Sequence, residues 1–121
     1  MTWSRIRLDL ARTADFPQGS AGISYLLDLP LNEDGRIDVN RVRKEPERAR
    51  VLRSLPNAPD LTGYVLRAPS GWVFSYAPGE RDDENVFHLE THAIRPGEYL
   101  TLTESDGRQL PLRVASVQPL G

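Results

Sequence analysis

The chain has 121 residues, ten prolines, nine glycines and no cysteine, and its formal net charge at pH 7 is −2. This length predicts one domain, residues 1–121, that can bury a core without a disulfide or a structural metal. The lack of cysteine excludes disulfides, cysteine-based zinc fingers, iron–sulfur clusters and thiol nucleophiles.

The first predicted element is a strand over residues 5–10. Ile6, Leu8 and Leu10 alternate with charged residues, which is the period-2 pattern of a half-buried strand. A start of this kind does not resemble a signal peptide. No stretch approaches the run of about 18 apolar residues that a membrane helix needs. We therefore expect a cytoplasmic protein without a membrane segment.

The second predicted strand covers residues 23–29 and follows a loop rich in small residues. Ile23, Tyr25, Leu27 and Leu29 share one side of it, so we expect it to lie centrally in the sheet. A turn is predicted over 32–35. Residues 46–55 then contain good helix formers after Pro46, a residue suited to the first helical turn, and predict one short helix.

The second half of the chain has the pattern of successive hairpins. We expect 61–67 to pair with 72–77, and 98–104 to pair with 109–117 across an Asp-Gly turn. Residues 78–85 form a predicted acidic, solvated loop, and 86–94 a further strand.

About seven short strands and one helix predict a mainly β protein. The favoured architecture is a small antiparallel β-barrel, closed or partly open, with the helix near residues 46–55 plugging one end or covering an edge. An immunoglobulin-type sandwich is less favoured because the cysteine pair is missing and the middle of the chain reads as helical. Exposed strand edges could pair between two copies of the chain, so we expect either a monomer or a homodimer.

A candidate metal or acid–base site lies at His88, Glu90 and His92. On a strand these three side chains share one face, with neighbours about 6.6 Å apart, so Glu90 and either histidine could share a divalent metal ion. The alternative interpretation is the polar outer face of a strand. We expect no other cofactor.

Four aromatic residues form a second candidate set: Tyr64, Trp72, Phe74 and Tyr76. Exposed rings beside arginine would form a stacking platform for single-stranded nucleic acid. The favoured interpretation places the rings in the core, where they supply much of its apolar volume. A sequence pI near 5.7 also disfavours a nucleic-acid partner.

Charge is distributed unevenly along the chain. Residues 36–53 hold seven basic and three acidic side chains, a net +4, whereas residues 79–106 hold two basic and eight acidic ones, a net −6. The two segments either attract each other within the fold or steer a partner. The candidate partner-binding residues are Arg43, Lys44, Arg50 and Arg53.

We find no catalytic signature in the sequence. The first hypothesis is therefore a non-catalytic interaction module for a protein or small ligand. The second is the metal or acid–base site, and the third is a binder of single-stranded nucleic acid.

Overall fold

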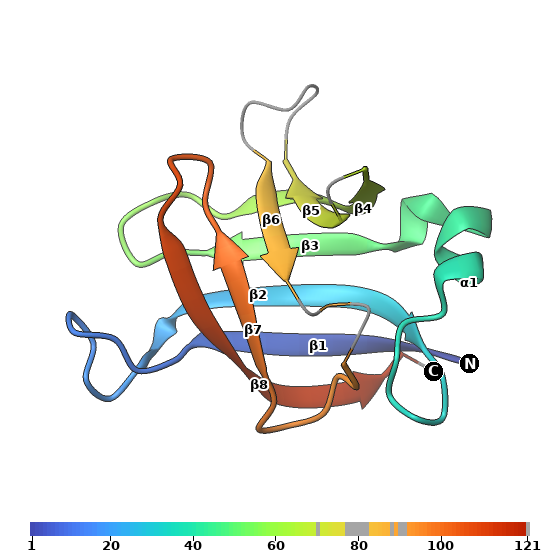
Figure 1. Cartoon of the computed structure of the whole chain (residues 1–121), viewed down its shortest axis with the longest axis horizontal. Coiled ribbons are helices and arrows are strands. Elements are labelled where there is room, and N and C mark those ends of the chain that lie inside the picture. Colours follow the sequence, from blue (N-terminus) through green and yellow to red (C-terminus); the bar gives the residue numbers. More distant parts are fainter. Residues whose placement is uncertain (70, 77–82, 88, 90–91, 121) are drawn as a thin grey trace.

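The computed structural model describes the whole chain except residues 70, 77–82, 88, 90–91 and 121. In the described part, eight strands form a closed antiparallel barrel in which each strand pairs with the next and the last pairs with the first (Figure 1). The strands are β1 (Thr2–Leu10), β2 (Ser20–Leu31), β3 (Arg50–Ser54), β4 (Leu61–Ala68), β5 (Gly71–Ser75), β6 (Glu84–Phe87), β7 (Tyr99–Thr103) and β8 (Gln109–Pro119). The prediction of a mainly β, small antiparallel barrel is confirmed.

The prediction of one short helix is confirmed, but its predicted position over 46–55 is wrong. Helix α1 spans Val39–Lys44, a short 3₁₀ turn, η1, spans Pro46–Arg48, and β3 covers five further residues of the expected helix, Arg50–Ser54. The Asp38 side chain caps α1 by accepting a hydrogen bond from the backbone N–H of Arg41 at 3.0 Å. Since β3 pairs with both β2 and β4, these two ladders override the local helix propensity of the segment.

The predicted hairpins are present, and the predicted strand over 86–94 is present with different bounds. β6 begins at Glu84 and ends at Phe87, and the described residues beyond it form turns and bends. The β7–β8 hairpin turns through Gly107, whose φ of +89° suits glycine.

Strand β8 closes the barrel because it pairs with both β7 and β1. Its first part pairs with β7 up to Arg113, and its second part pairs with β1 from Leu112 onward. The pairing register with β1 shifts between Arg7 and Leu8, a bulge of the kind that bends strands. The long strands β1 and β2 run along the molecule, whereas β6 and β7 cross them steeply (Figure 1).

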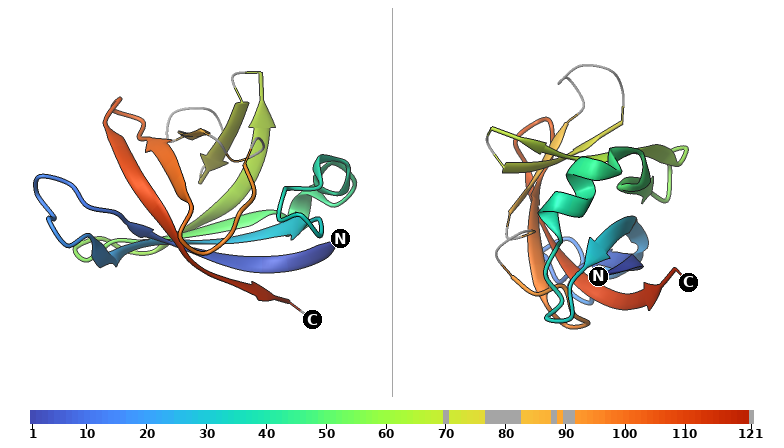
Figure 2. Two further views of the ribbon diagram at one scale, coloured as in Figure 1. Left: turned by 60° about the horizontal axis from the view of Figure 1, so that its bottom comes forward. Right: turned by 90° about the vertical axis from the view of Figure 1, so that its right-hand side faces the viewer.

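The interior is filled by alternate side chains of the strands. Its most deeply buried large residues include Ile6, Leu27, Phe74, Leu102 and Leu112. Helix α1 lies at one end, where Val42 joins the core, and Figure 2 (right) looks onto that end. The interior also holds the buried carboxyl group of Glu84, which forms part of the site described next.

Candidate functional site

The structure combines the basic and the aromatic candidates into two arginine–tyrosine pairs on opposite faces of one sheet. The Arg50 guanidinium lies 5.2 Å from the centre of the Tyr64 ring, and that of Arg53 lies 5.1 Å from the Tyr76 ring. Arg50 and Arg53 are three positions apart on β3, so their side chains leave the strand on opposite sides. Arg50 is exposed, whereas Arg53 faces the barrel interior.

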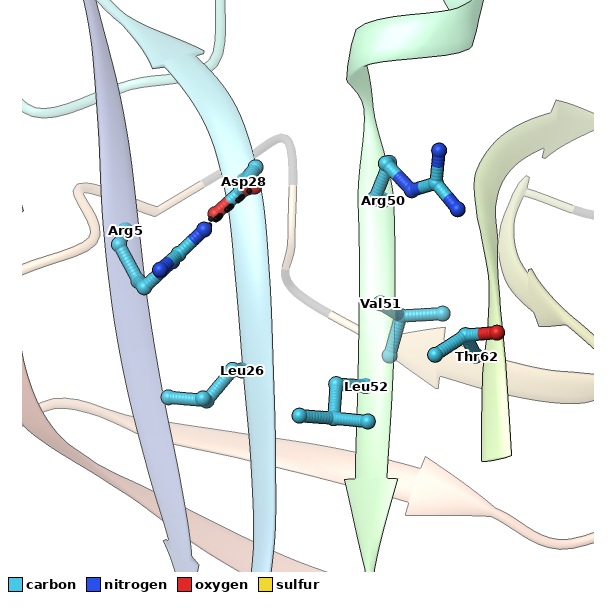
Figure 3. A pocket seen from close by; sticks show the side chains of 7 residues that line it. All are labelled: Arg5, Leu26, Asp28, Arg50, Val51, Leu52 and Thr62. Carbon is cyan, nitrogen blue, oxygen red and sulfur yellow. Dashed lines mark hydrogen bonds and ion pairs between the residues drawn. The ribbon is translucent and has the colours of Figure 1, made fainter. Parts of the chain in front are cut away.

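The outer pair borders a shallow groove of about 240 Å³ that crosses β1 to β4 (Figure 3). We call it the outer groove, and its lining residues are Arg5, Leu26, Asp28, Arg50, Val51, Leu52 and Thr62. Strand register places Arg5, Asp28, Arg50 and Tyr64 in one row across the four strands. The row is therefore a direct consequence of pairing, with one residue from each strand.

The two arginines of this row differ in whether they have a carboxylate partner. Arg5 donates two hydrogen bonds to the Asp28 carboxylate, of 2.9 and 3.1 Å, whereas the Arg50 side chain points away toward β4 (Figure 3). Among the described residues Arg50 makes no ion pair, and its contact is the Tyr64 ring. Its guanidinium N–H groups are thus available to an acceptor from outside the chain.

Apolar surface accompanies this guanidinium. Tyr64 is 41% exposed and Leu66, two positions further along the same face of β4, is 40% exposed. Leu26 and Leu52 are half-buried in the outer groove. Arginine and tyrosine are the residue types enriched at the energetic centres of protein interfaces, and contiguous exposed apolar surface marks interaction sites.

The inner pair, Arg53 and Tyr76, belongs to a cluster around Glu84. Glu84 is only 2% exposed. The Tyr76 hydroxyl donates to Glu84 Oε1 at 2.5 Å, and both Tyr25 and Arg53 donate to Oε2 at 3.5 Å. These contacts link β2, β3 and β6 with the residue that follows β5.

Glycine at position 63 makes this arrangement sterically feasible. A Cβ atom there would lie 2.1 Å from the carbonyl oxygen of Ser75 and 2.9 Å from the Cα of Tyr76. Gly63 therefore allows β4 to approach the end of β5, which carries the Tyr76 ring inward.

Burial controls the protonation of the cluster. It raises the pKa of Glu84 above its ordinary value, although the Tyr76 hydrogen bond and the Arg53 charge act in the opposite direction. Burial, followed by the Glu84 charge, also raises the pKa of Tyr25 and of Tyr76. Both phenols therefore stay protonated at neutral pH and remain hydrogen-bond donors.

We interpret the Glu84 cluster as a structural network. A carboxyl group with a raised pKa can serve in acid–base chemistry when a reacting group lies within reach. Here both Glu84 oxygens accept from tyrosine or arginine side chains, which join strands distant in the chain. The basic segment 36–53 and the acidic segment 79–106 meet at this point, through Arg53 and Glu84.

The structure does not test the predicted metal site, because two of its three residues are not described. His88 and Glu90 lie outside the described residues, and His92 is exposed in a bend after β6. Within the described ranges, no group of three histidine, aspartate or glutamate side chains is placed to hold a metal ion.

The aromatic set is divided between the two faces, so it does not form one stacking platform. Trp72 is 3% and Phe74 0% exposed, as the core interpretation requires, and Tyr76 also faces inward. Tyr64 lies on the outer face because its neighbours Gly63 and Val65 occupy the inner positions of β4. The remaining basic candidates, Arg43 and Lys44, are exposed in the last turn of α1.

Sequence reasoning missed two residues of the inner cluster. The sequence pattern predicts Glu84 in the solvated acidic loop, but Glu84 is the first residue of β6 and shares the inward face with Val86. The same kind of pattern places Tyr25 on an apolar strand face and indicates no polar role for its hydroxyl. The available signal was the alternation itself, which places both polar groups on buried faces.

No helix in the described part of the chain has the length and apolar character that crossing a membrane requires. No family model, no curated protein and no solved structure matches the chain. The outer groove and the Glu84 cluster are therefore the features from which a function can be inferred.

Proposed function

We propose that the protein is a non-catalytic interaction module that binds a carboxylate-bearing segment of a partner protein at the outer groove. The supporting observation is the exposed Arg50–Tyr64 pair, in which the guanidinium has no carboxylate partner among the described residues. A cytoplasmic location remains part of this proposal.

Chemical complementarity indicates the kind of partner. An arginine offers a planar set of donors that matches a carboxylate, and a tyrosine ring supplies rigid contact area. The half-buried Leu26 and Leu52 favour aliphatic side chains beside that carboxylate. The partner segment should therefore carry acidic and aliphatic residues together.

The test uses an acetylated and amidated nine-residue peptide in which glutamate and leucine alternate, beginning and ending with glutamate. Titration into the ¹⁵N-labelled protein should shift amide signals of β2, β3 and β4 saturably. Arg50→Ala should weaken binding about fivefold, the upper range for an exposed ion pair. Raising the salt concentration should also weaken binding, because exposed charges are screened.

Two controls isolate the role of the groove. Arg113→Ala removes the same charge from an exposed position on β8, next to Asp9 and Tyr99 in register, and should leave binding unchanged. A peptide with glutamine in place of glutamate should bind more weakly. Equal affinities of the Arg50→Ala and Arg113→Ala proteins for the acidic peptide would refute the proposal.

A further inference from the structure

A second groove lies further along β4 and is also bordered by arginine. It has a volume of about 640 Å³ and lies between α1, η1 and the second half of β4. We call it the helix groove; its lining includes Val42, Arg43, Pro46, Leu66 and Arg67.

The outer face of β4 connects the two grooves. Thr62 lines the outer groove and Leu66 the helix groove, while Tyr64 lies between them with Arg50 over its ring. All three β4 positions are exposed. The four-residue step from Thr62 to Leu66 spans about 13 Å along a strand. One extended chain can therefore contact both grooves.

The charges along this face of β4, which we call the β4 track, favour an acidic occupant. Among the described residues, four arginines and a single aspartate line the two grooves, and Arg5 already holds that aspartate, Asp28. Arg43 is exposed and, in the part of the chain that the structure describes, pairs with no carboxylate. Together with Arg50 it provides two separate positive charges along one path.

We infer that the partner segment is an extended acidic polypeptide that runs along β4 from the outer groove, over the Arg50–Tyr64 pair, into the helix groove. This inference rests on the proposed function and adds the length, path and composition of the segment. Aliphatic residues in both grooves, among them Leu52 and Leu66, favour a polypeptide with leucine-like side chains. The net charge of −2 disfavours a nucleic acid strand on the same path.

The test compares the nine-residue Glu/Leu peptide with the tripeptide Glu-Leu-Glu, also acetylated and amidated. The tripeptide reaches about 10 Å when extended, too short to occupy both grooves. The nine-residue peptide should bind at least about tenfold more tightly, because its second contact is intramolecular. Arg50→Ala should weaken both peptides, whereas Arg43→Ala should weaken the longer one about threefold and leave the tripeptide unaffected.

Leu66→Ser, at an exposed position, supplies a second variant and should reproduce the effect of Arg43→Ala. If Arg50→Ala weakens both peptides but Arg43→Ala and Leu66→Ser weaken neither, the inference fails and the proposed function stands. If neither peptide binds, both fail. Tighter binding of an eight-nucleotide oligothymidylate than of the nine-residue peptide would overturn the assignment of a polypeptide partner.

Discussion

The hydroxyl of Tyr76 has a clearly defined acceptor, since it lies 2.5 Å from Oε1 of the buried Glu84. Glu84 is charged or neutral depending on pH, and its neighbours come from strands far apart in sequence. The effect of this contact on the free energy of unfolding can be measured with substitutions that change a single atom or group, such as Tyr76→Phe and Glu84→Gln.

Tyr76→Phe should lower the free energy of unfolding by about 1 to 2 kcal/mol, because the variant leaves a buried carboxyl group without its shortest hydrogen bond. Urea unfolding at pH 7 provides the measurement. Tyr64→Phe is the matched control, since the Tyr64 ring is exposed, and it should change the free energy by less than about 0.5 kcal/mol. Equal stabilities of the two variants would contradict the assigned role of Glu84.

Stability should also depend on pH through Glu84. Burial raises its pKa in the folded protein above the ordinary value of 4.5, so the folded state holds this proton more tightly than the unfolded state. The contribution of the protonated Glu84 to the free energy of unfolding is therefore fully present below pH 4.5. It is lost as the pH rises through the pKa of Glu84 in the folded protein.

Urea unfolding of the native protein and of Glu84→Gln between pH 4 and pH 8 tests this sign. The difference in unfolding free energy should shift in favour of Glu84→Gln as the pH rises from 4.5, because glutamine does not titrate. A shift in the opposite direction would show that the Tyr76 hydrogen bond and the Arg53 charge outweigh burial.

At the scale of elements, the barrel strands follow from alternation, but β3 does not. The segment around Val51 consists of residues that are compatible with a helix, and its own pattern is too short to decide. Its state depends on ladders with β4, the next strand of a hairpin, and with β2, whose residues are distant in sequence. Local reasoning therefore predicted most of the strands and failed where pairing partners determine the structure.

The same limit applies to the candidate site. The sequence identified Arg50 and Tyr64, but as members of separate sets, because their proximity comes from the register between β3 and β4. It did not identify Glu84, since a run of acidic residues is usually solvated. Alternation gives the face of a residue, whereas the partner across the sheet requires the pairing register.

Gly63 provides a test of the β4–β5 element. Gly63→Ala places a methyl group against the backbone of Ser75 and should cost about 3 kcal/mol of stability, the upper range for overpacking. Gly22→Ala is the control, because its nearest atom, Ser20 Oγ, would lie at an ordinary contact distance of 3.5 Å. Thermal unfolding followed by circular dichroism should separate the two; equal midpoints would contradict the close approach of β4 and β5.

At the scale of the whole molecule, opposite charges are used in two ways. The segments 36–53 and 79–106 attract each other in the interior through Arg53 and Glu84, while Arg43 and Arg50 of the basic segment face outward. A protein with a net negative charge thus presents a locally positive track along β4. Both interpretations of the charge asymmetry in the sequence therefore remain compatible with one fold.

The pairing of β1 with β8 has a consequence for biosynthesis. During translation β1 leaves the ribosome long before β8, so its unpaired edge is exposed to other nascent chains for most of that time. The seam between these two strands has the largest sequence separation in the sheet and carries the largest loop-closure cost. A chain truncated before Gln109 should retain this exposed edge and self-associate, which light scattering would detect.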